Sequence, residues 1–106
     1  MANAREAQFL KMVKDYPTSP LGHFSLGKLY LDEGQPAQAV SPLLEAVRLA
    51  PDFAAALLAL GNACMRAQRF DEARSAFERA RDEALKQKHA TLAAEAEEQL
   101  AELETG

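Results

Sequence analysis

An internal repeat of 34 residues is the feature that most constrains what this 106-residue chain can fold into. The pair Leu26-Gly27 recurs as Leu60-Gly61 at that offset. Four other pairs share the offset: Ala39 and Ala73, Leu43 and Phe77, Ala46 and Ala80, and Pro17 and Pro51. Repeats of this length are supersecondary units that bury their apolar faces against their neighbours. We therefore expect a stack of similar units rather than an unrepeated helical bundle.

Each period is expected to hold two helices, because apolar residues recur at three- and four-residue spacing. Ser19 and Pro20 suit the start of the first helix, as a hydroxyl cap and a first-turn proline. Gly34 suits the left-handed residue that ends this helix. The second helix then begins at Pro36 and stops at Pro51, which cannot continue it.

The second period follows the same plan. Asp52 is expected to cap a helix over residues 53–66, and its partner runs from about Phe70 past Ala84. Four consecutive polar residues over 86–89 favour a break after that partner, although one long helix is the alternative. Small residues, Gly27 with Ala39 and Gly61 with Ala73, are expected to let the helices of each pair approach closely.

These residues together resemble the tetratricopeptide repeat, whose period is about 34 residues. The matches are Leu26, Gly27, Tyr30, Ala39, Leu43, Ala46 and Pro51 in the first period and Leu57, Leu60, Gly61, Ala73, Phe77 and Ala80 in the second. His23, Cys64 and Leu85 depart from the family pattern. The resemblance implies an all-α fold, a right-handed solenoid of antiparallel helix pairs with five to six helices. Repeat one would span residues 20–52 and repeat two residues 54–86.

Two further helices are expected at the ends of this single domain. Residues 3–17 keep the spacing of a second repeat helix, so they form either an N-terminal cap or the remaining half of a repeat in a longer array. Residues 89–104 are amphipathic, and residues 89–106 carry five acids without any Lys or Arg. A polar-faced last helix of this kind is what ends a repeat stack.

Composition and charge exclude several classes of protein. The net charge is −4 and bases are interspersed with acids, so we expect no nucleic-acid partner. The longest apolar run, residues 53–60, is too short to cross a membrane, and the N-terminus lacks the apolar stretch of a signal peptide. The single Cys64 cannot form an internal disulfide. These features indicate a cytoplasmic protein without a membrane partner.

We expect no enzyme activity, cofactor or metal site. His23 and His89 lie far apart without acids at ligand spacing, and there is no glycine-rich phosphate loop. Cys64 falls at a core position, where a thiol is usually an inert small hydrophobe.

A protein or peptide partner is the function that the resemblance implies, because the first helix of each pair lines the concave side of such a stack. The groove would present Leu21, Phe24, Lys28, Leu31, Leu58, Asn62, Met65 and Arg66. The last helix would add residues around Leu92, Ala93 and Ala96. The alternative is that these apolar surfaces pair with the terminal helices, with other repeats or with a second copy of the chain. Self-assembly therefore stays open beside binding of a partner.

The residues that bind one known ligand class of the family can be compared with this sequence. Chaperone-adaptor repeats hold an acidic C-terminus in a clamp of Lys, Asn and Arg side chains. The corresponding positions here read Phe24 with Lys28, then Ala59, then Leu92 with Ala93. We therefore expect no binding of acidic chaperone C-termini through such a clamp.

Overall fold

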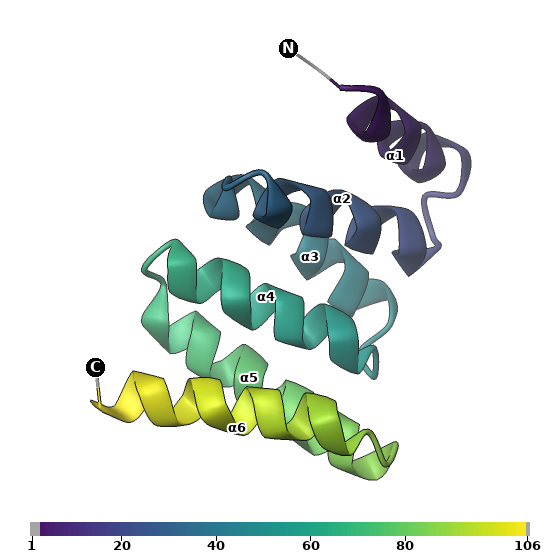
Figure 1. Ribbon diagram of the computed structural model, residues 1–106. Coiled ribbons are helices and arrows are strands. Elements are labelled where there is room, and N and C mark those ends of the chain that lie inside the picture. The colour runs from purple at the N-terminus through teal and green to yellow at the C-terminus, as the bar shows by residue number, and fades with distance from the viewer. Residues whose placement is uncertain (1–2, 106) are drawn as a thin grey trace.

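The fold is a stack of six α-helices, seen in a computed structural model that describes residues 3–105 (Figure 1). The helices are α1 (Ala4–Asp15), α2 (Pro20–Asp32), α3 (Pro36–Leu49), α4 (Ala54–Arg66), α5 (Phe70–Lys86) and α6 (Ala90–Thr105). No strand occurs within residues 3–105. The predicted all-α solenoid of helix pairs is confirmed, and α5 and α6 are separate helices.

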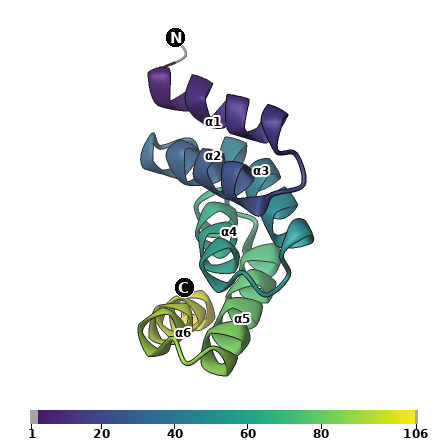
Figure 2. The same cartoon turned by 90° about the vertical axis from the view of Figure 1, so that its right-hand side faces the viewer.

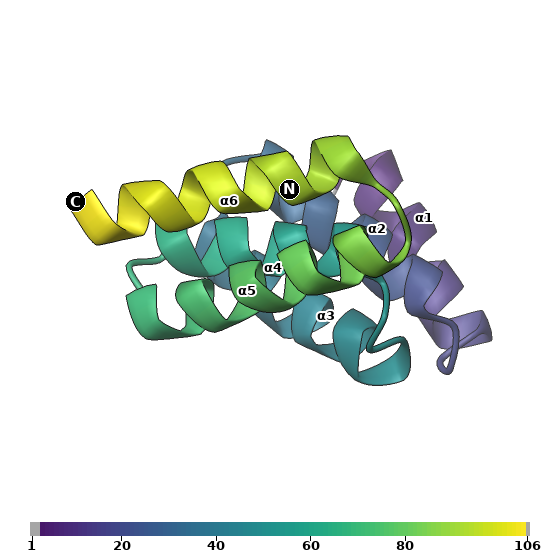
Figure 3. The ribbon, with the colours of Figure 1, turned by 90° about the horizontal axis from the view of Figure 1, so that it is seen from below.

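Helices α2/α3 and α4/α5 form two antiparallel pairs that stack in chain order. Each helix packs mainly on the next along the chain, while α2 also contacts α4 and α4 also contacts α6. As a result α2, α4 and α6 share one face, and α3 and α5 lie behind them (Figures 1 and 2). Seen from below, α5 and α6 lie side by side at the C-terminal end of the stack (Figure 3).

The turns that end α2, α4 and α5 have the same geometry, with a left-handed residue after the helix. These residues are Gly34 (φ 74°), Gln68 (φ 63°) and Lys88 (φ 62°). In each turn two backbone N–H groups bond back to the last helical turn; after α4, Gln68 N donates to Met65 O (3.0 Å) and Arg69 N to Cys64 O (2.7 Å). This is the double hydrogen-bond pattern of a Schellman motif. The pattern confirms the role expected of Gly34, and Gln68 holds the same conformation one period later.

Helix α5 is three residues longer than α3, with 17 residues against 14. Helix α3 stops at Leu49, just before Pro51. The residue one period after Pro51 is Leu85, which keeps a backbone N–H and lets α5 continue to Lys86. The loss of one proline therefore lengthens this helix.

The start of α4 differs from the expectation that Asp52 caps it. The cap position is Phe53, and no side chain accepts a hydrogen bond there. Asp52 lies one residue too early, and its backbone carbonyl instead accepts a hydrogen bond of 2.6 Å from Gln87 Nε2. Ser19, by contrast, caps α2 as expected, since its hydroxyl accepts from Leu21 N at 3.3 Å.

Close approach within each pair is made by glycine against a large side chain, not by glycine against alanine as expected. A methyl group placed on Gly27 would lie 2.4 Å from Leu43 Cγ, and one on Gly61 would lie 2.5 Å from Phe77 Cε1. Leu43 and Phe77 are fully buried. The repeated glycines therefore leave room for the largest core residues of the opposing helix, while Ala39 is buried beside them.

Candidate functional site

Two hollows lie between α4 and α6 on the face that they share. The N-terminal hollow, of about 630 Å³, is lined by Phe53 and Leu58 from the α4 side and by Leu92 and Glu95 from α6. It is also lined by Ala54 and Ala55 of α4 and by Gln87, Lys88 and His89 of the α5–α6 turn.

The C-terminal hollow lies at the other end of the same two helices. It has about 400 Å³ and is lined by Met65, Phe70, Glu102 and Leu103. Phe70 is half exposed at the start of α5, and Met65 and Leu103 are half buried. Each hollow therefore has one glutamate of α6 among largely apolar walls, and the N-terminal hollow also has Lys88 and His89 of the α5–α6 turn.

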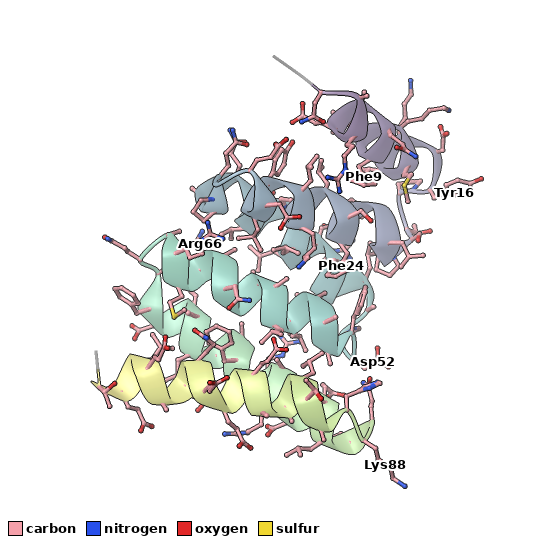
Figure 4. All side chains as sticks on the ribbon, viewed as in Figure 1. Phe9, Tyr16, Phe24, Asp52, Arg66 and Lys88 are labelled. Carbon is pink, nitrogen blue, oxygen red and sulfur yellow. The ribbon has the colours of Figure 1, made fainter. Side chains whose placement is uncertain are left out.

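Phe53, which lines the N-terminal hollow, also forms an aromatic pair with Phe24 of α2. The rings of Phe24 and Phe53 are 4.8 Å apart at 46°. Figure 4 shows Phe24 between α2 and α4 rather than free in solvent. Phe24 thus stabilises the contact between repeats and presents only part of its ring to the face shared by α2, α4 and α6, which we call the concave face.

The remaining residues expected in the groove fall into three groups. Leu21 and Lys28 are exposed on α2, and Leu58, Asn62 and Met65 are partly exposed on α4. Leu31 is only 7% exposed and belongs to the core between the repeats, so we leave it out of the binding surface. Its burial follows from the contact of α2 with α4, which covers that side of α2.

Arg66 connects the two repeats at the opposite end from the aromatic pair. Its Nη1 donates to the backbone carbonyl of Leu31 at 3.4 Å. Figure 4 shows Arg66 where the ends of α2 and α4 come together. The guanidinium is therefore already used in part for holding the repeats together.

On α6 the sequence analysis named one residue that lines a hollow, Leu92, and missed Glu95 and Glu102. Ala93 and Ala96 are buried in the core, at 3% and 0% exposure, so they do not line the groove as expected. Glu95 and Glu102 border the hollows instead. Glu95 and Glu102 are seven residues apart, which places them on the same side of a helix. This spacing was the signal in the sequence that could have identified them.

Cys64 and His23 line neither of the two hollows. Burial raises the pKa of the Cys64 thiol, which disfavours the reactive thiolate. His23 Nε2 lies 3.2 Å from the carbonyl of Pro17, at the connection between α1 and α2. Within residues 3–105 no group of three or more His, Cys, Asp or Glu side chains is placed to hold a metal ion.

Among the helices of the described part of the chain, none is both long and apolar enough to cross a membrane.

The fold defines the chain as an all-α helical-repeat solenoid. Sequence comparison matches the tetratricopeptide repeat family over residues 24–89, so the chain belongs to that family. No curated protein sequence matches the chain. Among solved structures it is similar to the first tetratricopeptide repeat domain of Spaghetti (RPAP3), which is bound to the HSP90 peptide SRMEEVD. That similarity has a TM-score of 0.81 at 21% identity, over 94% of this chain and 75% of the other.

Proposed function

We propose that this chain is a non-catalytic protein–protein interaction module that binds a segment of a partner protein on its concave face. The observation that carries the proposal is the pair of hollows between α4 and α6, whose walls are largely apolar and open on one face. Concave, mostly apolar sites with a few polar groups are where proteins bind ligands. The hollows lie at the two ends of α4, and a peptide or helix can reach both more readily than a small molecule.

The polar residues of the concave face would orient the bound segment. Asn62 lies between Leu58 and Met65 on α4, and its amide both donates and accepts hydrogen bonds. Lys28 is exposed one repeat earlier. A peptide is also the ligand in the complex of the similar Spaghetti domain, which supports a peptide as the class of ligand here.

A second candidate function is self-assembly, and exposed apolar residues at the N-terminal end of the stack favour it. Helix α1 has no fully buried residue, Leu10 is 46% exposed and Leu21 is 57% exposed. An apolar surface left open in a solenoid can pair with a further repeat or with a second copy. The oligomeric state in solution distinguishes this function from binding of a different protein.

The test compares two substitutions on opposite faces of the stack. Leu58→Asp places a charge in the wall of the N-terminal hollow, whereas Leu44→Asp places one on α3, where Leu44 is 44% exposed. Peptides selected from a random displayed library against the wild-type chain provide the ligand. We expect Leu58→Asp to abolish their binding and Leu44→Asp to preserve it, with both variants helical by circular dichroism.

Three results would contradict the proposal. Selected peptides whose binding survives Leu58→Asp would bind elsewhere. A wild-type chain that sediments as a dimer, which either Leu58→Asp or Leu10→Asp makes monomeric, would show self-assembly instead. A sharp loss of thermal stability in Leu58→Asp, with binding retained below the melting temperature, would show that Leu58 is core rather than binding surface, because a buried unpaired charge is costly.

A further inference from the structure

We propose that the segment bound between α4 and α6 is a basic amphipathic helix, with two apolar residues one heptad apart and Lys or Arg beside them. This inference rests on the proposed function and names the chemistry of its partner. It comes from the register in which the apolar residues of α4 face the acids of α6.

Each hollow pairs one apolar residue of α4 with one glutamate of α6, and these two pairs define the register of the two helices. Leu58 and Glu95 line the N-terminal hollow, and Met65 and Glu102 line the C-terminal one. Leu58 and Met65 are seven residues apart, as are Glu95 and Glu102. Helices α4 and α6 run in the same direction, with both N-termini near the labelled Asp52 and Lys88 (Figures 1 and 4). The surface therefore repeats one apolar residue and one acid after about 10.5 Å, two turns of helix.

This repeat distance discriminates between a helical and an extended ligand. A helix advances about 10.5 Å in seven residues and returns to the same face, so two of its side chains enter both hollows. An extended chain covers that distance in about three residues, which point to alternating faces. The second anchor of an extended peptide would therefore point away from the surface. The spacing favours a helix with apolar residues at positions i and i+7.

The sign of the partner's charge follows from α6. Glu95 and Glu102 are exposed, and within the described residues neither takes part in an ion pair. Residues 89–106 contain no Lys or Arg that could neutralise them. Lys88 and His89 also line the N-terminal hollow, but within the described residues neither forms an ion pair with Glu95. Arg66 donates to the Leu31 carbonyl. A bound Lys or Arg beside each apolar anchor would complement these two carboxylates, and the apolar surroundings would reduce screening of the pair.

The experiment uses the full chain and a designed peptide of about 18 residues, long enough for about five helical turns. The peptide is alanine-based, with leucines at i and i+7 and lysines flanking them on one side. One control peptide has the same composition with leucines at i and i+5, which places them on different faces. Another has glutamate in place of each lysine. Titration calorimetry measures each affinity at low and at moderate salt.

Matched variants of α6 test the acids. Glu95→Lys/Glu102→Lys reverses the two groove carboxylates. Glu97→Lys/Glu104→Lys makes the same change of net charge two residues further on, about 200° around the helix. We expect the first pair to weaken binding of the lysine peptide by about tenfold or more, and the second by less than about threefold. All four glutamates are exposed, so both variants should melt like the wild type.

Several outcomes would overturn the inference. Equal losses in the two variants would show a general charge effect, and equal binding of the i+5 peptide would remove the argument for a helix. Tighter binding of the glutamate peptide, or no binding of the lysine peptide, would contradict the predicted sign of the charge. A wild-type dimer that excludes the peptide would assign the groove to a second copy. If library peptides require Leu58 but are acidic or extended, only this inference fails, whereas independence from Leu58 refutes the proposed function itself.

Discussion

The close approach of α4 and α5 at Gly61 makes a quantitative prediction about stability. A methyl group added to Gly61 would lie 2.5, 2.6 and 2.9 Å from Cε1, Cδ1 and Cζ of Phe77. The Phe77 side chain is fully buried, so its ring has little room to move away. Gly61→Ala should therefore destabilise the domain, although alanine is normally the better helix former.

The expected magnitude is the difference between two effects. Overpacking of a filled core costs about 1–3 kcal/mol, and contacts this short with a buried ring favour the upper half of that range. Replacing a mid-helix glycine with alanine returns about 1 kcal/mol through helix propensity. We expect Gly61→Ala to lower the free energy of unfolding by about 1–2 kcal/mol.

A double-mutant cycle with Phe77→Val separates the two effects, because valine lacks all three of the ring carbons concerned. In the Phe77→Val background, Gly61→Ala should become stabilising by up to about 1 kcal/mol, since only the propensity term remains. Urea unfolding followed by circular dichroism gives the four free energies. The coupling between the two sites should be about 2–3 kcal/mol.

The reversal of sign is the result that tests the argument. If Gly61→Ala stabilises the wild type by about 1 kcal/mol, the helices do not approach closely at this position. If Gly61→Ala destabilises both backgrounds equally, the cost has a source other than Phe77. The first repeat has the same kind of close contact, between Gly27 and Leu43.

Three other predictions concern a turn, a thiol and a ligand. Gln68→Gly should raise the free energy of unfolding by about 0.5–1 kcal/mol, because Gln68 holds a left-handed φ of 63° that glycine adopts without strain; a loss in urea melts would contradict this. Cys64 is 1% exposed and burial raises its pKa, so a thiol reagent should modify it only at the rate at which the domain opens, and fast labelling of the native protein would contradict its burial. The acidic HSP90 peptide SRMEEVD should show no micromolar binding at moderate salt by calorimetry, because buried Ala59 and half-buried Leu92 replace polar groups of the clamp; measurable binding would show that other residues hold such peptides here.

The helix boundaries follow largely from local sequence, because the residues that start and stop helices act through the backbone of their neighbours. Pro36 and Pro51 fix the limits of α3, and Gly34 forms the left-handed turn that ends α2. The expectation that Asp52 caps α4 was wrong because the helix begins one residue later than expected, which puts Phe53 at the cap position. The local sequence does not fix the start of a helix to a single residue. The left-handed conformation of Gln68 was not predicted either. Gln68 lies 34 residues after Gly34 and adopts the same turn, although it is not a glycine.

The candidate site was less predictable, because it depends on which faces of different helices meet. The period of 34 residues determined the stack, its helix pairs and the position of α4 on the concave face. It did not show that contact between α2 and α4 buries Leu31, or that Phe24 packs on Phe53. The rotation of α6 about its axis, which buries Ala93 and leaves Glu95 beside Leu58, was decided only by packing against α5 and α4. A repeat thus encodes in sequence the contacts that recur, while the proposed binding surface lies where a helix outside the repeat docks, and tertiary packing alone sets the orientation of that helix.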